Sequence, residues 1–519
     1  MRNTIKFNLA ESNYESQIRD HLAKQYQINK EATINGRLTY YDTFDWRLFN
    51  KSLVLFTFQG RLILRKLGKD RIIHSVITKP VPRFIWEFPE GDLKQYLKPV
   101  IKMRRLLNLV DLTSRITPYR ILNKDEKTVT RLCLETIRTR GRKDSRPIGA
   151  HLWLKSVKGY PKYFKKVKKQ LENLGLTPCE DEEVFSHAMR EVGRDPGGYS
   201  SKLRLQLTPD MRADEATIEI WRFLFQVIKI NEAHIEQNID TEILHDFRVA
   251  IRRTRSALVW NKDIFTEETI SRFKKSLSFV GRISNELRDL DVYLLKKNEY
   301  KAMLPAGLRD GIDPLFEYLG KQRAVSFRKV IRNLNSKQYK RIMQDWESFL
   351  DEPQYELVSG SAAKIPVYEL ASKRIHKQYL NVIKEGNRIL ENCDDDKLHK
   401  LRIQCKKLRY LIQFFSNLFS QKKISKLVGQ LKNLQDVLGD YNDLSVQVNY
   451  LFEVAKEMPA TLSGLNRTLI AIGSLIGKLE TKRQSVKESF AETFMRFSSL
   501  QNQQLFQALF VLQSKKVAQ

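Results

Sequence analysis

A repeated basic segment constrains the fold of this chain more than any other feature of its sequence. The segment "LHDFRVAIRRTR" begins at Leu244, and "LHKLRIQCKKLR" begins at Leu398. Residues 244–292 and 398–446 share one register without a gap, because every matched pair is 154 positions apart, as His245 and His399 are. Such a repeat predicts a duplicated helical unit, with two bundles related by a pseudo-two-fold axis.

A helical period places the cations of each copy on one stripe and apolar residues on the neighbouring stripe. Neither stripe contains an acidic residue, although like charges four residues apart on a helix repel each other. We therefore expect two antiparallel copies that face each other and bind a long anion, with Asp289 and Asp443 orienting arginines or capping helices. The binding residues predicted in the copies are His245, Arg248, Arg252, Arg253, Arg255, His399, Arg402, Lys406, Lys407 and Arg409.

Further cations at helical spacing lie between the two copies and are assigned to the same groove. Arginine matches phosphate with two parallel hydrogen bonds, and lysine supplies a compact charge. The alternative is a pair of solvated basic faces with weak surface salt bridges, in which the two histidines are structural. Because the two copies keep one register, we favour the anion-binding groove over two separate solvated faces. The additional residues are Lys321, Arg328, Arg332, Lys373 and Lys377.

The net charge supports an anionic partner but does not identify it. The 519 residues include 91 Lys and Arg against 60 Asp and Glu, a formal charge of +31. Such a field attracts nucleic acid, anionic membrane surfaces and phosphates. We expect a reduced, cytoplasmic protein without membrane insertion, because no apolar run is long enough to span a bilayer and no signal peptide is present. Four scattered cysteines, Cys133, Cys179, Cys393 and Cys405, predict neither disulfides nor a zinc site.

Upstream of a Pro-Gly-Gly break within 192–201, the pattern changes from helices to strands. Basic residues in or beside several strands suggest a barrel with a wet interior. We therefore predict an α+β protein: an antiparallel β tunnel or barrel with flanking helices over 1–198, and an all-α domain of two related bundles over 212–519. The expected strands include 53–58, 62–65, 72–77, 129–134 and 151–154.

The helical part resembles a known family. The segments "LHDFRVAIRRTRSAL", "LRDLDVYL", "LHKLRIQCKKLRYLIQFF" and "LGDYNDLSV" are similar to the signatures of the CHAD domain, the conserved histidine α-helical domain. This resemblance implies a helical domain with internal two-fold pseudosymmetry that binds inorganic polyphosphate through its basic face. It also implies association with polyphosphate granules and no catalysis by this domain.

The N-terminal part resembles the CYTH domain of the triphosphate tunnel metalloenzymes, through "YYDTFDWRLFNKSLVLF" and the segment that begins "HLWLKSVKGYPKYF". That family opens with E-x-E-x-K, whose carboxylates hold a divalent metal, but this chain has Arg2 and Thr4 before Lys6. A second acidic pair is expected before Lys155, and His151 and Trp153 occupy its place. Glu135 is the one remaining candidate metal ligand.

A hard cation such as Mg²⁺ needs oxygen ligands, so the lost carboxylates predict an inactive tunnel domain with neither metal nor cofactor. The cations that could still line its interior and bind an anion are Lys6, Arg65, Lys79, Arg131 and Lys155. The alternative is that they are ordinary charged strand positions.

Three functions therefore remain in competition. The first is non-enzymatic binding of inorganic polyphosphate by the repeated helices. The second is a Mg- or Mn-dependent triphosphatase in the N-terminal domain. The third is nucleic-acid binding, which usually adds aromatic stacking platforms to a basic groove. The signature helices place few exposed aromatic residues beside their arginines.

Overall fold

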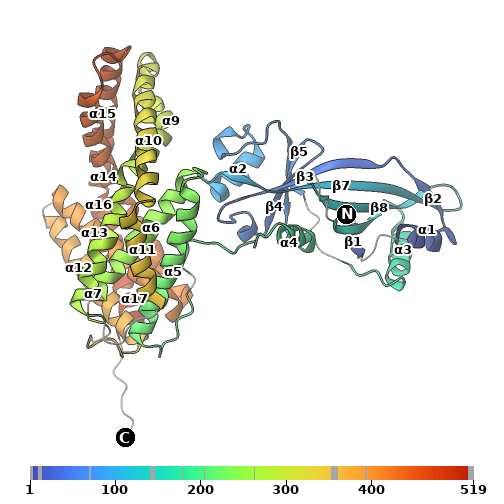
Figure 1. Ribbon diagram of the computed structural model, residues 1–519, viewed down its shortest axis with the longest axis horizontal. Helices are drawn as coiled ribbons and strands as arrows, with labels where there is room; N and C mark the ends of the chain where they lie inside the picture. The colour runs from blue at the N-terminus through green and yellow to red at the C-terminus, as the bar shows by residue number, and fades with distance from the viewer. Residues whose placement is uncertain are drawn as a thin grey trace, which may run out of the picture. The chain divides into compact units, whose positions relative to one another are not determined.

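The computed structural model describes residues 4–9, 14–68, 72–140, 147–178, 181–203, 205–261, 263–351, 360–391 and 394–511. The chain divides into two compact units, Met1–Ser200 and Ser201–Gln519, whose elements are labelled in Figure 1. The first unit is built on an antiparallel sheet and the second is helical, which confirms the expected fold class. Arg2, Cys179 and Cys393 lie outside the described residues.

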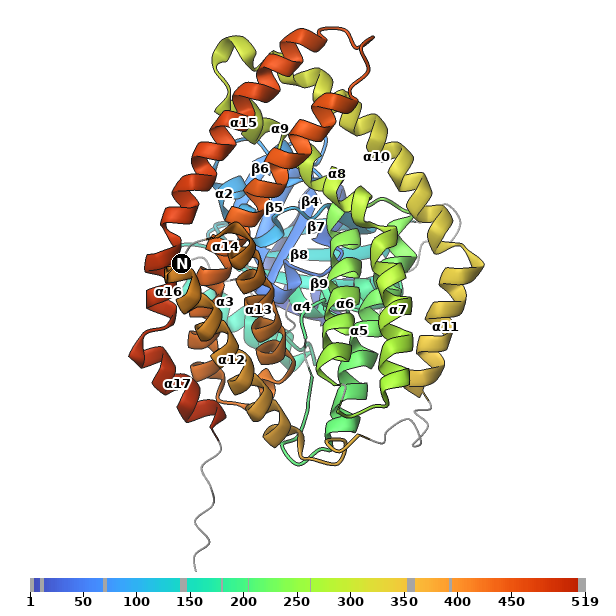
Figure 2. The same ribbon diagram turned by 90° about the vertical axis from the view of Figure 1, so that its left-hand side faces the viewer.

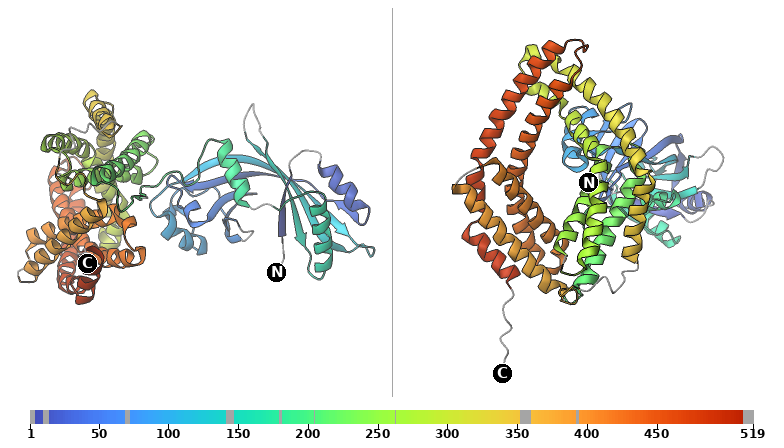
Figure 3. Two further views of the ribbon diagram at one scale, coloured as in Figure 1. Left: turned by 90° about the horizontal axis from the view of Figure 1, so that it is seen from below. Right: turned by 60° about the vertical axis from the view of Figure 1, so that its left-hand side comes forward.

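The first unit contains a nine-stranded sheet with the order β1-β9-β8-β7-β3-β4-β5-β6, and β2 pairs with β7. The ladder ends at β1 and β6, so the described strands form a curled half-barrel rather than a closed barrel (Figure 3). The strands are β1 (Thr4–Leu9), β2 (Gln27–Lys30), β3 (Ile34–Thr43), β4 (Leu53–Phe58), β5 (Arg61–Lys66), β6 (Ile72–Ile77), β7 (Leu106–Leu122), β8 (Thr128–Thr139) and β9 (Pro147–Ser156).

Successive side chains of β8 and β9 point to opposite faces of the sheet. One face packs against helices, and the other lines a pocket. Leu132 and Leu152 belong to a core cluster beneath α1 (Tyr14–Ala23) and α3 (Pro161–Asn173). Cys133 and Trp153 point to the opposite side and line a pocket. The helix α4 (Asp181–Glu191) packs near that pocket, where Phe185 meets the Tyr40 ring edge-on at 5.3 Å. A further helix, α2 (Asp92–Ile101), covers the β4–β5 part of the sheet.

The second unit has the duplicated helices near its centre. Figure 2 shows α5 and α7 packed on α6, and α12 and α14 packed on α13. The helices are α5 (Ala213–Ile235), α6 (Thr241–Trp260), α7 (Glu267–Ile283), α8 (Asn285–Leu295), α9 (Lys297–Met303), α10 (Asp313–Leu334), α11 (Lys337–Asp351), α12 (Val367–Glu391), α13 (Asp395–Phe414), α14 (Gln421–Glu457), α15 (Leu465–Glu488), α16 (Phe490–Phe497) and α17 (Leu500–Phe510).

Aromatic packing fixes each half of the helical unit separately. In the first half, Trp221 meets Trp346 edge-on at 5.2 Å, and Phe273 meets Trp346 at 4.7 Å. In the second half, the Tyr379 and Phe506 rings stack at 3.7 Å. These buried contacts give α6 and α13 rigid supports, which is what a binding surface needs. Among the described residues, no helix combines the length and the apolar character that crossing a bilayer requires.

Candidate functional site

The two copies of the basic segment meet directly. The Arg252 Nε donates a hydrogen bond to the Tyr410 hydroxyl at 2.8 Å, and the Arg253 Nη2 donates to Gln413 Oε1 at 3.3 Å. Further along both helices, Trp260 meets Phe414 edge-on at 5.8 Å. Residue numbers therefore increase together along α6 and α13.

The expectation of antiparallel copies is wrong. Trp260 and Phe414 are equivalent positions of the repeat, since they are 154 residues apart. A contact between equivalent positions lies close to the pseudo-two-fold axis. Because the two helices point in the same general direction, this axis runs roughly parallel to them and not perpendicular to them. The axis brings the basic stripes side by side while both helices point in the same general direction.

We call Arg252, Arg253, Arg402, Lys406 and Arg409 the cationic cluster. Burial, together with the positive charges of Arg402 and Arg252, lowers the pKa of Lys406 to about 8. Burial also lowers the pKa of Arg402, and Arg252 again adds to the shift, against the opposing effect of Asp443. Positive charges from both copies, at exposed Arg252 and at partly buried Arg402 and Lys406, therefore lie within electrostatic reach of one another, an arrangement that an anion would stabilise.

The outer arginines of the stripes are held by the helices that follow them. In the second copy, the Arg402 Nη2 lies 3.1 Å from Asp443 Oδ1, as expected of an arginine-orienting acid. In the first copy, the Arg248 Nη1 donates to Asn285 Oδ1 at 2.8 Å and to Ser284 Oγ at 3.1 Å. Asp289 acts on Arg248 electrostatically, and burial raises the pKa of this carboxyl.

Two other side chains of the second stripe are also anchored to α14. The His399 Nδ1 lies 2.8 Å from Asn442 Oδ1, and the Arg409 Nη1 donates to Gln435 Oε1 at 3.1 Å. Gln435 in turn donates to the backbone carbonyl of Cys405 on α13 at 2.7 Å. The orientation of the His399 and Arg409 side chains is therefore set by neighbouring polar side chains and not by solvent alone.

A pocket of about 260 Å³ opens beside the cationic cluster. Of the seven described residues that line it, four are cationic and none is acidic. Lys274 on α7 is one of them, and the sequence prediction missed it because the equivalent position in the second copy is Val428. The lining residues are Arg252, Arg255, Ser256, Val259, Trp260, Lys274 and Lys407.

The remaining predicted cations of the helical unit lie on other surfaces. Lys321, Arg328 and Arg332 are exposed on α10, which packs against α8 and α15. Lys373 and Lys377 are exposed on α12, and the Lys373 ammonium lies 2.5 Å from Glu369 Oε1. None of these five residues lines the pocket. His245 is half-buried on α6, the helix that carries Arg252.

We call the first unit, Met1–Ser200, the β unit. Its pocket measures about 280 Å³ and lies on the sheet face opposite α1 and α3. Three predicted cations line it: Lys6, Arg65 and Lys155. Two others do not, because Lys79 is exposed after β6 and the Arg131 Nη1 donates to Glu31 Oε2 at 3.0 Å.

Glu135 also lines this pocket, but its carboxylate is already engaged. The Ser114 hydroxyl donates to Oε1 at 2.7 Å, and the Trp153 indole donates to Oε2 at 2.8 Å. Neighbouring His151 is buried, and burial together with Lys6 lowers its pKa to about 3. Over the described ranges, no group of three or more His, Cys, Asp or Glu side chains is arranged to hold a metal ion. The described residues of this pocket therefore do not fit a Mg²⁺ or Mn²⁺ centre.

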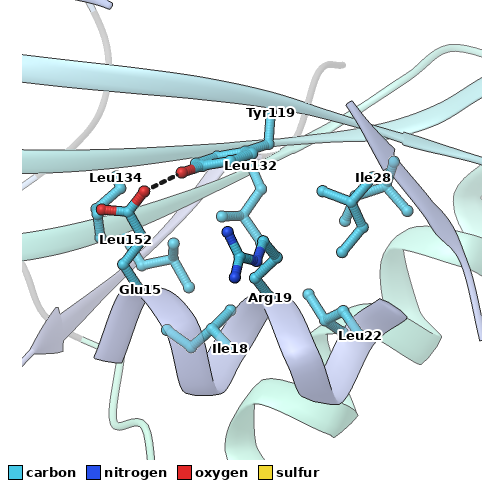
Figure 4. Close-up of a pocket in the computed structure, with 10 residues that line it drawn as sticks. Glu15, Ile18, Arg19, Leu22, Ile28, Tyr119, Leu132, Leu134 and Leu152 are labelled. Carbon is cyan, nitrogen blue, oxygen red and sulfur yellow. Dashed lines mark hydrogen bonds between the residues drawn. The ribbon is translucent and has the colours of Figure 1, made fainter. Parts of the chain in front are cut away.

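A third cavity, beneath α1, has no functional character (Figure 4). Its volume is about 20 Å³, little more than a water molecule occupies. Leu22, Ile28 and Leu132 line it, and a hydrogen bond from Tyr119 to Glu15 closes one side. This cavity is a packing gap between α1 and the sheet.

Comparison with known proteins identifies the helical unit. Residues 219–451, which run from α5 into α14, match the CHAD domain family. The chain contains a CHAD domain. Both copies of the basic segment, and the contact between them, lie inside the matched range, so the internal repeat is part of this domain.

Two curated Mycobacterium tuberculosis proteins, "Uncharacterized protein MT2285" and "Uncharacterized protein Rv2226", are each 21% identical to this chain over 283 residues. The match covers 52% of this chain and 53% of each relative, so the chain spans about half the length of the curated relatives it matches.

Among solved structures, the chain is similar to the CHAD domain from the plant Ricinus communis, with 24% identity and a TM-score of 0.48 over 57% of this chain and 96% of that one. A second is PptA from Streptomyces chartreusis, with 13% identity and a TM-score of 0.44 over 55% of this chain and all of that one. A third is HpAC1 from Hippeastrum, for which a dominant triphosphatase activity is described, with 14% identity and a TM-score of 0.25 over 38% of this chain and 100% of that one.

Proposed function

We propose that the CHAD domain of this protein binds inorganic polyphosphate, without catalysis, through the cationic cluster between α6 and α13. The observation that carries this proposal is the meeting of two repeated cationic stripes, in which burial and the charges of Arg402 and Arg252 lower the pKa of Lys406 to about 8. Such crowding destabilises the fold unless a polyanion neutralises it. The resemblance to the CHAD family points to the same ligand and to association with polyphosphate granules.

The neighbouring pocket extends the proposed binding surface. Arg255, Lys274 and Lys407 lie around it with Arg252, so a chain of phosphates leaving the cluster meets further cations. Guanidinium groups bind phosphate oxygens in pairs, and lysines add charge without strict geometry. Repeating phosphates suit this arrangement because every unit along the polymer offers the same ligand.

Charge reversal tests the site. We expect Arg252→Glu and Lys406→Glu each to weaken binding of long-chain polyphosphate about tenfold, and the double variant to weaken it further, because each loses charge-assisted hydrogen bonds. Isothermal titration calorimetry measures the affinities. Lys478→Glu on α15 makes the same charge change at an exposed position outside the cluster and should bind like the wild type. Wild-type affinity in the double variant would refute the proposal.

Nucleic acid is the second candidate, favoured by one aromatic side chain. Trp260 lines the basic pocket and could stack on a base. We expect polyphosphate to displace single-stranded RNA from the protein at equal phosphate concentration, because the cluster itself presents guanidinium and ammonium groups. Equal or tighter RNA binding that is lost in Trp260→Ala would favour the nucleic-acid function.

A triphosphatase activity of the β unit is the third candidate. Glu135, the one carboxylate predicted as a ligand, accepts hydrogen bonds at both oxygens. With Mg²⁺ or Mn²⁺ present, we expect the wild-type protein to release no more phosphate from tripolyphosphate than a Glu135→Gln variant does. Turnover that this substitution abolishes would establish the enzyme.

A further inference from the structure

The pocket of the β unit differs in chemistry from the phosphate-binding surface proposed for the CHAD domain. Ten of its fourteen lining residues are apolar or aromatic, and four are charged. At the basic pocket of the CHAD domain, four of seven lining residues are cationic. The apolar and aromatic walls are formed by Leu38, Tyr40, Phe56, Phe58, Ile63, Ile72, Ile116, Cys133, Ile137 and Trp153.

The cations of this pocket lie against aromatic rings. The Lys6 ammonium is 4.6 Å from the centroid of the Trp153 ring, and the Lys155 ammonium is 5.6 Å from it. From the other half of the sheet, the Arg65 guanidinium lies 5.2 Å from the Phe56 ring. A ring face attracts a cation, so these contacts hold the three cationic groups at the pocket wall.

The charges of the pocket limit the size of that anion's head group. Among the described residues, three cations and the Glu135 carboxylate line the pocket. A head with one or two negative charges can be bound by these cations. A triphosphate would place further negative charge against the apolar walls, where unpaired charge is strongly disfavoured.

We propose that this pocket binds one amphipathic organic anion, with a carboxylate or phosphate-monoester head near Lys6 and Lys155 and an aliphatic body along the apolar walls, without a metal ion. The volume of about 280 Å³ lies just below the usual range for small-molecule sites, which suits a ligand with a short aliphatic chain. The proposal does not depend on polyphosphate binding, because the two pockets are lined by different units of the chain.

Titration calorimetry of the full-length protein with decanoate and with decyl phosphate, both below their micelle concentrations, tests the proposal. We expect one saturable site. Shortening the ligand to octanoate should weaken binding more than tenfold, since each buried methylene contributes about a fourfold change in affinity. Decanoate and decyl phosphate together distinguish a carboxylate from a phosphate head. Absence of saturable binding by both ligands would overturn the proposal.

Charge-removing variants locate the site. Lys6→Met and Lys155→Met should each weaken binding about tenfold, because methionine keeps a similar length and removes the ammonium. Lys166→Met, at an exposed position of α3 over the opposite sheet face, is the matched control and should bind like the wild type. Thermal unfolding of each variant checks that the β unit remains folded. Unchanged affinity in both pocket variants would refute the assignment.

Two further measurements separate this site from the CHAD domain. The Arg252→Glu, Lys406→Glu variant should bind decanoate normally, and tripolyphosphate should not displace decanoate. In addition, 2-bromodecanoate should quench part of the tryptophan fluorescence, and the quenching should be lost in Trp153→Phe, since Trp153 lies beside Lys6 and Lys155, where the head group is proposed to bind. Displacement by tripolyphosphate, or quenching that persists without Trp153, would contradict the proposal even if polyphosphate binding is confirmed.

Discussion

At the scale of single residues, Lys406 links stability to binding. Its folded pKa of about 8 lies below the usual value of 10.5, so the charged form disfavours the folded state. This unfavourable contribution is complete below pH 8 and disappears as the pH rises from about 8 to 10.5. We therefore expect Lys406→Met to be more stable than the wild type at pH 7, by about 1 kcal/mol, and to bind polyphosphate less tightly.

Urea unfolding followed by circular dichroism at pH 7 and pH 9.5 measures this effect. The stability gained through Lys406→Met should be smaller at pH 9.5, because wild-type Lys406 is then mostly neutral. Lys400→Met, at an exposed position of the same helix, is the control and should show no such dependence. A gain that is equal at both pH values would show that the charge of Lys406 is not responsible.

Site residues that occur in both copies of the repeat could be predicted from the sequence. Site residues that occur in only one copy could not. The register of 154 residues located Arg252 and Lys406 because both copies keep a cation there. Lys274 escaped notice because its counterpart is Val428. The sequence pattern also gave no signal that Tyr410 would accept a hydrogen bond from Arg252, since that contact joins positions 158 residues apart.

At the scale of elements, short strands rich in β-branched or aromatic residues were predicted correctly from the sequence. The expected segments 53–58 and 72–77 coincide with β4 and β6. The long strand β7 was missed, and it contains Pro118. On one edge of β7, pairing with β3 ends at Ile116 and pairing with β2 begins at Tyr119. Pro118 therefore lies in a gap between two partners, where a missing amide donor is tolerated, and local sequence alone does not reveal this gap.

The duplicated helices also repeat their N-caps. The Asp240 carboxylate accepts hydrogen bonds from the backbone amides of Glu242 and Ile243 at 2.9 and 3.2 Å. Its equivalent, Asp394, accepts one at 3.3 Å from Asp396. We expect Asp240→Ala to destabilise the helical unit by about 1–2 kcal/mol and Asp394→Ala by about 0.5–1 kcal/mol. Urea unfolding measures both, and Asp→Asn variants, which keep a capping oxygen, should lose much less.

The contact between α12 and α16 depends on a glycine. A Cβ atom added to Gly386 would lie 1.9 Å from the Phe494 ring, which is itself fully buried. We therefore expect Gly386→Ala to destabilise the helical unit by about 1–3 kcal/mol through overpacking, although alanine favours helices. Gly473→Ala on α15, where nothing lies within 4 Å, is the control and should be neutral or slightly stabilising. Equal unfolding midpoints for the two variants would contradict this account.

At the scale of the whole molecule, two units with separate cores are expected to respond to separate ligands. Polyphosphate at about 100 times its Kd should stabilise the CHAD domain by about 2.7 kcal/mol, which raises its Tm by about 4 °C. Decanoate should raise only the transition of the β unit, since its proposed pocket lies within Met1–Ser200. Differential scanning calorimetry with each ligand alone and with both together tests this independence. If either ligand shifts both transitions, the two binding sites are coupled, because a ligand stabilises only the cooperative unit whose folded state it binds.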